Sequence, residues 1–390
     1  MKVIVLGGSG TQGRAAVLDL ARSEAVDEVV SADSDSAGLD SLRSVADLSK
    51  VRGEAVDARD HRELVGLMRS AAAVIDLLPR QFMANVCAAA VEAEVSVVNT
   101  NYAAGIAEFD GPARAAGVTI IPECGLDPGI DLILYGKAAR RFDRLEVIRS
   151  YCGGIPEAAA ADNPLKYKAS WTWEGVLSST MRDSLIIRDG RRVEIPAARQ
   201  HDPEFVHEID FPGLGTMEAI PNGMADQFIE QLGLGASIRE TGRYALRWPG
   251  WSDFWRPLKA FGFFDRTPVT GLPAGTSPYD MLDKLLGPQL EYGDDEKDLV
   301  AMVNIFEGLV DGRPTRLTCR LLIERDLSTG LLAMSQAVGF TASIVAQMIA
   351  GGEIPEVGVL SPARHIPPAR FFEELEIRGV TVDEYEGILE

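Results

Sequence analysis

Short apolar runs alternate with helical segments through the first 122 residues, and this alternation restricts the chain to few folds. Strands are predicted at residues 2–6, 28–32, a short run that ends near residue 57, 71–79, 95–100 and 117–122. The helical segments between them are residues 12–22, 37–47, 61–69 and 81–92. Strands separated by helices of roughly ten residues are typical of a parallel sheet covered on both faces. We therefore predict an α/β fold whose N-terminal part is a Rossmann-type, doubly wound parallel sheet.

The pattern changes after about residue 124. Residues 145–331 are rich in strand-like runs, interrupted by Gly/Pro-rich and Trp-rich stretches such as RWPGWSDFWRP, which indicates a second domain of α+β type. Residues 332–350 return to an Ala-rich helix that ends in two glycines, and this helix is predicted to complete the first domain. The predicted division is a Rossmann domain, a substrate domain and a returning C-terminal segment, at residues 1–124, 125–331 and 332–390.

The charge of the chain restricts its partners. It has 38 Lys and Arg against 58 Asp and Glu, a formal charge of −20. So negative a surface repels phosphate backbones and anionic membranes, so we expect neither nucleic acid nor membrane as a partner. No run approaches the length of about 18 apolar residues that a membrane helix needs. A small molecule is the expected partner, and a homodimer is expected from the frequency of that state alone.

The cysteines and histidines are few and dispersed. The four cysteines, which form no C-x-x-C pair, are Cys87, Cys124, Cys152 and Cys319. His201 and His207 are six residues apart, unlike the i, i+4 pair of a helical zinc site. We therefore expect no disulfide framework and no metal, and we infer a reducing, cytoplasmic setting.

A glycine-rich loop follows the first predicted strand and opens the first helix. Gly8, Gly10 and Gly13 fit the pattern G-x-G-x-x-G. The first glycine permits a tight turn, the second lets the backbone approach a pyrophosphate, and the third lets the helix and strand pack closely. The N–H groups at the helix start can then bind the pyrophosphate. The residues between the glycines therefore also belong to the predicted cofactor site: Ser9, Thr11 and Gln12. The alternative is a glycine-rich turn without a nucleotide.

The rest of the predicted cofactor site follows from the ends of later strands. Asp33 ends the second strand, about 20 residues beyond the loop, where a carboxylate can accept both ribose hydroxyl hydrogens. A 2′-phosphate would meet that carboxylate with no nearby arginine, so NAD is predicted rather than NADP. Asp57 is placed near the adenine edge or, equally, serves as a loop aspartate. Leu78 and Pro79 are placed along the nicotinamide half, and Asn99 is predicted to contact the cofactor.

Five segments later in the chain resemble those of a known family. They are GLDPGID at 125–131, SYCGGIP at 150–156, NPLKYKASW at 163–171, MEAIPN at 217–222 and LRWPG at 246–250. In this order they resemble the saccharopine dehydrogenase family, in its glutamate-forming, reductase-like branch. The resemblance implies a Rossmann domain closed by a C-terminal helix and a second domain that carries an amino-acid substrate. It also implies oxidation of a C–N bond by a nicotinamide cofactor, giving an imine that water opens to an aldehyde and an amino acid.

The resemblance implies roles for three residues. Asp127 and Cys152 match positions near the reacting carbon and nitrogen, and Tyr102 matches an aromatic residue in the same cleft. The chemistry agrees, because hydride transfer needs a neutral amine and so a group that takes a proton. Lys168 is a further candidate proton carrier, and Cys152 would be a weak one unless its pKa is shifted. The structural alternatives are a packed cysteine and a helix N-cap at Asp127.

The predicted substrate site contains Tyr102, Lys168, Trp171, Asn222 and Arg247. Surface lysine and core tryptophan are the alternatives for Lys168 and Trp171. The chain departs from the family pattern after Asn222, where an arginine that would suit a carboxylate is replaced by Gly-Met. Arg247 remains as a candidate carboxylate partner. The alternatives to a saccharopine-type activity are a lysine 6-dehydrogenase, which releases ammonia, and a non-catalytic NAD-binding sensor.

Overall fold

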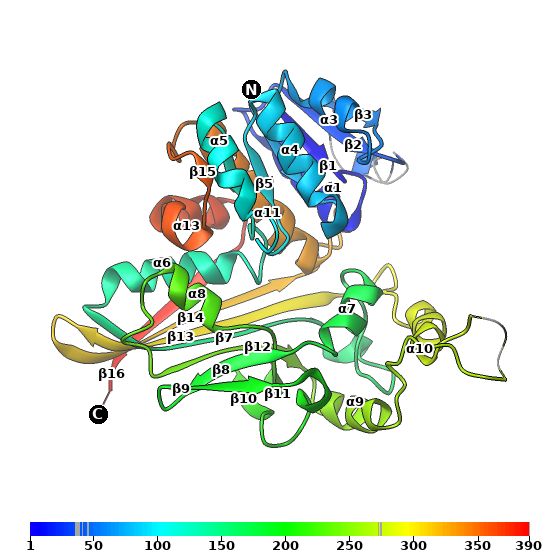
Figure 1. Ribbon diagram of the computed structural model, residues 1–390, viewed down its shortest axis with the longest axis vertical. Coiled ribbons are helices and arrows are strands. Elements are labelled where there is room, and N and C mark those ends of the chain that lie inside the picture. The colour runs from blue at the N-terminus through cyan, green and yellow to red at the C-terminus, as the bar shows by residue number, and fades with distance from the viewer. Residues whose placement is uncertain (36–39, 41, 45–46, 272, 274, 390) are drawn as a thin grey trace. The chain divides into compact units, whose positions relative to one another are not determined.

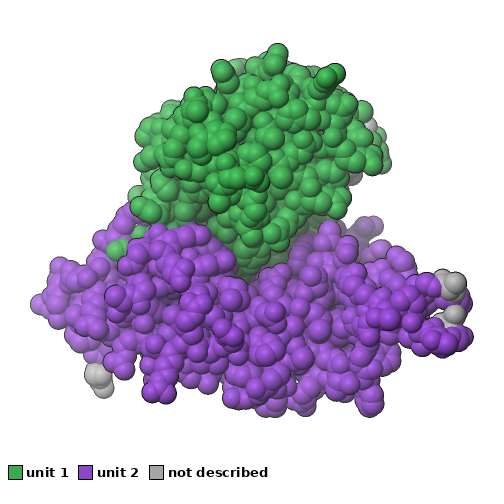
Figure 2. All heavy atoms as spheres, in the orientation of Figure 1, with its two compact units in different colours: residues 1–139, 326–382 green, residues 140–325, 383–390 purple. Residues whose placement is uncertain are grey.

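The chain forms two compact units, coloured separately in Figure 2. The structure, a computed structural model, describes residues 1–390 except 36–39, 41, 45–46, 272, 274 and 390. Unit 1 consists of residues 1–139 and 326–382, and unit 2 of residues 140–325 and 383–390. Helix α6, Ile130–Arg141, runs across the boundary between them. The chain therefore leaves the first unit and returns to it.

Unit 1 is built on a seven-stranded sheet with the order β15-β6-β5-β4-β1-β2-β3 (Figure 1). Its strands are β1 Lys2–Leu6, β2 Glu28–Asp33, β3 Val51–Ala55, β4 Ala73–Asp76, β5 Val97–Asn99, β6 Thr119–Ile121 and β15 Gly358–Val359. Every neighbouring pair is parallel. The order reverses between β1 and β4, which is the doubly wound arrangement and places a ligand-binding crevice at the carboxyl ends of these strands. The predicted α/β sheet is confirmed.

Helices cover the unit 1 sheet. They are α1 Thr11–Arg22, α3 His61–Met68, α4 Met83–Ala93, α5 Asp110–Ala116, α11 Ala333–Ala350, α12 Pro362–His365 and α13 Pro368–Ile377, with short 3-10 turns at Arg80–Phe82 and Ala107–Phe109. Asp60 caps α3 by accepting the N–H groups of Arg62 and Glu63. Helix α11 packs on α1 and on β4 and β5, as the predicted returning helix should. Gly339 makes this approach possible, because a Cβ there would lie 2.6 Å from that of Ala15.

Helix α11 also corrects one expectation from the sequence. By length and composition alone it could cross a membrane, since its 18 residues have a mean hydropathy of 1.3. The sequence argument overlooked it because Ser, Thr and Gln interrupt its apolar residues. In unit 1, 67% of this stretch is buried, and buried core helices satisfy the same test.

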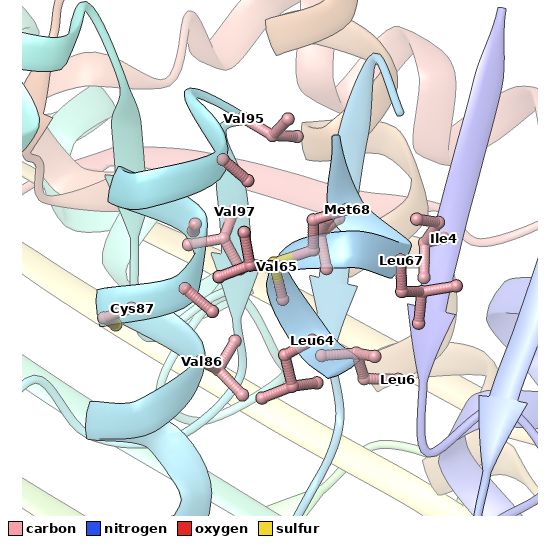
Figure 3. Close-up of a cluster of buried hydrophobic side chains, with 14 of the residues drawn as sticks. Ile4, Leu6, Leu64, Val65, Leu67, Met68, Val86, Cys87, Val95 and Val97 are labelled. Carbon is pink, nitrogen blue, oxygen red and sulfur yellow. The ribbon is translucent and has the colours of Figure 1, made fainter. Parts of the chain in front are cut away.

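The core between the sheet and α3 and α4 is drawn in Figure 3. Apolar side chains from β1, α3, α4, β5 and the turn before β5 converge there: Ile4, Leu6, Leu64, Val65, Leu67, Met68, Val86, Cys87, Val95 and Val97. Strand β1 is buried from Val3 to Leu6, so its β-branched run is covered on both faces, as parallel strands require. This packing fixes the end of β1, from which the glycine-rich loop emerges.

Unit 2 contains a mixed nine-stranded sheet with the order β10-β11-β12-β7-β13-β14-β16, and β8 and β9 branch from β12. Its strands are β7 Arg144–Pro156, β8 Ser184–Arg188, β9 Arg191–Ile195, β10 His207–Phe211, β11 Gly215–Pro221, β12 Glu240–Arg247, β13 Asp298–Val310, β14 Arg313–Glu324 and β16 Val382–Ile388. Among the strand pairs whose register is described, β12 and β7 are parallel and the others are antiparallel. This matches the predicted α+β character of the second domain.

The helices of unit 2 are α7 Trp173–Ser179, α8 Asp226–Gln231, α9 Trp251–Ala260 and α10 Pro278–Leu286. The last is closed by a capping box in which Ser277 and Asp280 bond reciprocally. An aromatic cluster that includes Tyr167, Trp251 and Trp255 forms a core beside β11. The Trp-rich stretch noted in the sequence therefore folds as α9 and packs inward with two of its tryptophans.

Three features differ from, or lie beyond, the elements predicted from sequence. The helix predicted at 37–47 falls partly on residues outside the described part of the chain. Strand β15 was not predicted, because it has only two residues. The C-terminal segment 332–390 was treated as one piece, whereas β16 pairs with β14 in unit 2. Its sequence, VDEYEGI, is almost entirely exposed and carries no apolar periodicity that would reveal the pairing.

Candidate functional site

The glycine-rich loop of unit 1 connects β1 to α1, and close contacts require glycine at two of its positions. A Cβ on Gly13 would lie 2.1 Å from the carbonyl oxygen of Gly7, and one on Gly8 would lie 2.3 Å from Oγ of Ser31. A Cβ on Gly10 would meet only the Gly7 oxygen, at 3.2 Å, and Gly10 itself is exposed. Gly8 and Gly13 therefore hold the turn, whereas Gly10 presents open backbone.

The start of α1 suits an anion. Gly10 precedes the helix in an extended conformation and, as a glycine, has no side chain with which to cap it. Thr11 is exposed, and Ser9 and Gln12 are partly exposed. The first N–H groups of a helix lack intrahelical acceptors and lie at the positive end of its dipole, so they can bind a diphosphate. The predicted pyrophosphate-binding positions thus lie on one short loop and the first turn of α1, where Gly8 and Gly13 are buried and the other four are at least partly exposed.

Asp33 reaches this loop from the end of β2. Its Oδ2 accepts the Ser9 N–H at 3.2 Å, and its Oδ1 accepts the Ser34 N–H at 2.7 Å. The carboxylate predicted to bind the ribose is therefore next to the loop predicted to bind the diphosphate. Asp57 is different, because its carboxylate forms an exposed ion pair with Arg59, with Nε to Oδ1 at 2.9 Å. Its role at the adenine edge stays a prediction.

The segment after β4 borders the glycine-rich loop. A Cβ on Gly7 would lie 3.1 Å from the Leu77 carbonyl oxygen and 3.5 Å from Cδ2 of Leu78. Leu78 is partly buried and Pro79 is exposed. Both residues therefore follow β4 at the switch point of the sheet, where the nicotinamide half of a dinucleotide was predicted to pass.

A buried polar chain lies at the ends of β4 and β5. Asp76 accepts the Leu78 N–H at 3.0 Å and a hydrogen bond from Nδ2 of Asn99, and Oδ1 of Asn99 accepts the Asn101 N–H at 2.6 Å. Burial raises the pKa of Asp76 to about 7, although both hydrogen bonds act to lower it. The Asn99 side chain is thus engaged by its neighbours, and its predicted contact with the cofactor stays a prediction.

Asp127 lies in a closed loop that leads into α6. The Gly125 N–H donates to the Pro128 carbonyl at 3.0 Å, and the Gly129 N–H donates to Oδ1 of Asp131 at 2.9 Å. Asp127 is partly exposed, whereas the residues on either side of it are buried. Helix α6 begins at Ile130, so Asp127 does not occupy the residue directly before the helix, as an N-cap would.

Tyr102 lies in the loop after β5, in the same unit as Asp127, and is partly exposed. Cys152 belongs to unit 2. It is 6% exposed in the middle of β7, where Ala245 of β12 and Met302 of β13 are its register partners. This burial agrees with the alternative of a packed cysteine, and a chemical role for Cys152 stays a prediction. All four cysteines, which are among the described residues, are buried, and none of them forms a disulfide.

Lys168 and Trp171 of unit 2 have structural partners. Nζ of Lys168 forms ion pairs with Glu296 and, at 3.5 Å, with Asp162. Burial alone would lower the pKa of Lys168, but the ion pair with Glu296 raises it, which makes this amine a poor proton acceptor. The Trp171 ring covers Gly175, where a Cβ would lie 2.3 Å from the ring. Their substrate roles stay predictions, and Lys168 is the weaker candidate for catalysis.

Asn222 and Arg247 meet at a small pocket in unit 2, lined by Ser179, Thr180, Gln200, His201, Ile220, Asn222, Ala245, Arg247 and Trp251. Arg247 is 7% exposed, and its guanidinium lies over the rings of Tyr167 and Trp251, at 5.1 and 4.9 Å. Its NH1 donates to the Leu246 carbonyl at 2.7 Å, and among the described residues it forms no ion pair with a carboxylate.

The charge around this pocket is positive. Burial, together with the charges of Lys259 and Arg247, lowers the pKa of His201 to about 2, so the imidazole is neutral. None of the described residues that line the pocket is acidic. Arg182 donates to Oδ1 of Asn222 at 3.2 Å, which brings another guanidinium to the place where the family pattern has an arginine. The positive charge favours an anion, but the cavity of about 10 Å³ holds no more than one water molecule, so a carboxylate can enter only if the lining residues move.

Sequence reasoning missed several residues of these sites. Gln200 and His201 line the pocket from a loop that has no motif, and Asp76 is an isolated aspartate at a strand end. The one available signal was a polar residue directly after a buried strand, which fits Asp76. For metals, no group of three or more His, Cys, Asp or Glu side chains in the described part of the chain could hold an ion.

Two family models match the chain. "Saccharopine dehydrogenase NADP binding domain" matches residues 3–121, and "Saccharopine dehydrogenase C-terminal domain" matches residues 125–380. Together they cover most of the chain and meet near residue 124.

Individual relatives agree with these models. The mitochondrial alpha-aminoadipic semialdehyde synthase of Rattus norvegicus is 27% identical over 82% of this chain, but the chain spans only 41% of that relative's length. The saccharopine dehydrogenase [NADP(+), L-glutamate-forming] of Saccharomyces cerevisiae is 25% identical, with 93% of this chain and 94% of the relative covered. A solved apo structure of the L-Glu-forming enzyme from that yeast has a TM-score of 0.86 at 22% identity and covers 99% of each chain. A homospermidine synthase from Legionella pneumophila, solved with NAD, has a TM-score of 0.65 at 10% identity, covering 99% of this chain and 91% of that one, and shares the fold.

Proposed function

Because the chain belongs to the saccharopine dehydrogenase family, we propose that it is a nicotinamide-dependent amine dehydrogenase that oxidises a C–N bond of a lysine-derived amino acid. The observation that carries the proposal is the glycine-rich loop at the uncapped start of α1, with Asp33 bonded to its Ser9. The contacts of Gly8 and Gly13 leave a turn of bare backbone, and this turn fits a dinucleotide diphosphate.

The proposed reaction has two stages, oxidation of the C–N bond to an imine and hydrolysis of that imine. A nicotinamide cofactor, when bound, would supply the acceptor for a hydride from the carbon next to the secondary amine. The amine also loses its proton, so a C=N bond forms in the substrate. Water then adds to the imine carbon, and cleavage of the C–N bond gives an aldehyde and a primary amine. For saccharopine the released amino acid is glutamate. Asp127, in its closed loop, is proposed to take the amine proton and to orient the water, and Tyr102 is proposed to assist from the neighbouring loop.

We further infer a preference for NAD. The names of the matching domain model and of the yeast relative specify NADP, so this is a point on which the chain would differ from them. The support is local: Asp33 ends β2 beside the loop, and a carboxylate there accepts two ribose hydroxyls but repels a 2′-phosphate. A chain adapted to NADP would need a cation at this point.

Asp33→Ala is expected to weaken NADH binding about tenfold and to bring the NADH and NADPH affinities closer together, because a charge-assisted hydrogen bond contributes about 1.5 kcal/mol or more. Titration of each reduced cofactor by its fluorescence measures the two dissociation constants. The control is Glu24→Ala, which likewise removes one negative charge but at an exposed position of unit 1. It should alter neither dissociation constant. An unmodified protein that binds NADPH more tightly than NADH would contradict the ribose argument.

The substrate carboxylate is proposed to bind at Arg247. Arg247→Gln is expected to raise the KM for the amine about 30-fold, with kcat changed less, because a buried guanidinium–carboxylate bond is worth roughly 2 kcal/mol. Arg247→Lys should recover only part of this, since lysine lacks the planar fork of donors. Steady-state kinetics measures the effect, and the exposed Arg188→Gln in the same unit is the control. A KM equal to that of the unmodified protein would assign Arg247 to packing alone.

A second candidate function, deamination of lysine, is favoured by one difference between this chain and the family pattern. Gly223 and Met224 follow Asn222 where an arginine is expected, and the nearby Arg182 already donates to Asn222, so fewer donors remain for a substrate with several carboxylates. Lysine, deaminated at its ε-amine, needs one amino-acid moiety fewer.

A panel of saccharopine, lysine and opine-like conjugates with NAD at alkaline pH tests the proposal. Formation of glutamate from saccharopine supports the first function, and release of ammonia from lysine supports the second. Binding of NAD without turnover of any amine would favour a sensor.

A further inference from the structure

Three loops follow β4, β5 and β6 at one edge of the unit 1 sheet. They carry Leu78, Tyr102 and, further along the last of them, Asp127, to which the proposed function gives roles. Loops that follow parallel strands emerge at the same edge of the sheet. Transfer of a proton or of hydride falls steeply when the groups involved are displaced by as little as about 1 Å. A residue that bonds these loops together is therefore a candidate for a role in the reaction.

Glu123 is such a residue. It lies two positions after β6, is 3% exposed, and Oε1 of its side chain accepts the Ala103 N–H at 3.2 Å. Its own N–H donates to the Asn101 carbonyl at 3.0 Å. Asn101 and Ala103 are the two residues that flank Tyr102. Glu123 thus holds the backbone on both sides of Tyr102, from a segment that continues directly into the loop of Asp127.

The segment that leads from Glu123 to the Asp127 loop is also held by hydrogen bonds, one of them to a buried carboxyl group. The next residue, Cys124, donates its N–H to the Asn99 carbonyl at 2.9 Å, which ties this segment to β5. Asp131 closes the Asp127 loop through its bond from the Gly129 N–H. Burial raises the pKa of Asp131 to about 8, and the charge of Glu123 adds to this effect.

The conformation of Glu123 argues for a specific purpose. Its φ of +63° lies in the left-handed region, which non-glycine residues seldom adopt and which costs roughly 1–3 kcal/mol when imposed. Burial of a carboxylate adds a further cost unless hydrogen bonds offset it. Residues in such strained conformations are concentrated at active sites and ligand-binding sites, where side chains must be placed accurately.

We propose that Glu123 is a positioning residue, which fixes Tyr102 through its bonds to Ala103 and Asn101 and joins the Tyr102 loop to the Asp127 loop. Its effect on turnover rests on the proposed function, whereas its effect on the loop does not. The hydrogen bond that Glu123 accepts from the Ala103 N–H, rather than the negative charge of Glu123, is what fixes the Tyr102 loop. The length of the side chain must then matter more than its charge.

Two variants separate length from charge. Glu123→Gln keeps the length and an acceptor oxygen, and kcat should stay within about threefold of the unmodified value. Glu123→Asp keeps the charge but withdraws the carboxylate by one methylene, and kcat should fall about tenfold while KM and the NADH dissociation constant change less than about twofold. The control is Glu94→Asp, because Glu94 also has a positive φ, of 57°, but is exposed at the end of α4. It should leave all three constants unchanged.

Amide hydrogen exchange at Ala103 gives a second measurement that needs no turnover. Exchange should be several-fold faster in Glu123→Asp than in the unmodified protein and in Glu123→Gln, because the Ala103 N–H loses its acceptor. The proposal is overturned if Glu123→Asp retains full kcat, if Glu123→Gln loses as much as Glu123→Asp, or if Ala103 exchange is unaltered. If no amine is turned over but the exchange pattern holds, the proposed function fails and the hold on the Tyr102 loop stands.

Discussion

Asp127→Asn is expected to lower kcat by about 100-fold with every amine that the unmodified protein oxidises, because general base catalysis typically contributes that much or more. The asparagine keeps the size of the side chain and cannot take the amine proton. Binding of NADH should change less than about twofold, since the predicted cofactor contacts are made by the glycine-rich loop and Asp33. Steady-state kinetics and fluorescence titration measure the two quantities.

The matched control for this prediction is Asp189→Asn. Asp189 lies in the exposed turn between β8 and β9 with a φ of 50°, a conformation that asparagine also tolerates. It should leave kcat unchanged. If Asp127→Asn retained full turnover, the proton would have to go elsewhere, and Tyr102 would become the first candidate.

Gly13→Ala is expected to destabilise unit 1 and to weaken NADH binding at least about tenfold. The new Cβ would lie 2.1 Å from the Gly7 carbonyl oxygen and 2.6 Å from Cα of Gly8. Both contacts are with backbone, which cannot rotate away, so strain of about 3 kcal/mol outweighs the gain of roughly 1 kcal/mol in helix propensity. Thermal unfolding and cofactor titration measure the outcome.

Gly66→Ala supplies the comparison for Gly13→Ala. Gly66 is also helical, in α3, but is exposed, and a Cβ there meets nothing within 4 Å. This change should leave NADH binding unaltered and stabilise the protein by up to about 1 kcal/mol. Equal effects of the two substitutions would mean that the close contact at Gly13 has no special importance.

The predicted cofactor site of unit 1 could be recognised in the sequence because its residues lie in one short stretch of the chain with fixed spacings. A strand, a tight turn and a helix need glycine at fixed spacings, and Asp33 follows at the end of the next strand. The same locality made the alternation of β1 to β6 with helices recognisable. Strand β16 had no such signal, because its pairing with β14 leaves nearly all of its residues exposed.

The remaining parts of the site depend on contacts between distant residues. The partner that makes Lys168 a poor proton carrier, Glu296, is 128 residues away, and no spacing rule connects them. Glu123 bonds to backbone groups of Asn101 and Ala103, which any residue there would supply, so no sequence pattern marks it. The pocket at Arg247 likewise gathers residues from several loops and strands.

The most direct test of the whole account is a crystal structure of the protein grown with saturating NAD. We expect the diphosphate on the backbone N–H groups at the start of α1, beside Gly10, and both adenosine ribose hydroxyls on Asp33. A glycine-rich loop that stays empty under these conditions, or that is closed by its own side chains, would contradict the assignment of this chain as a nicotinamide-dependent enzyme.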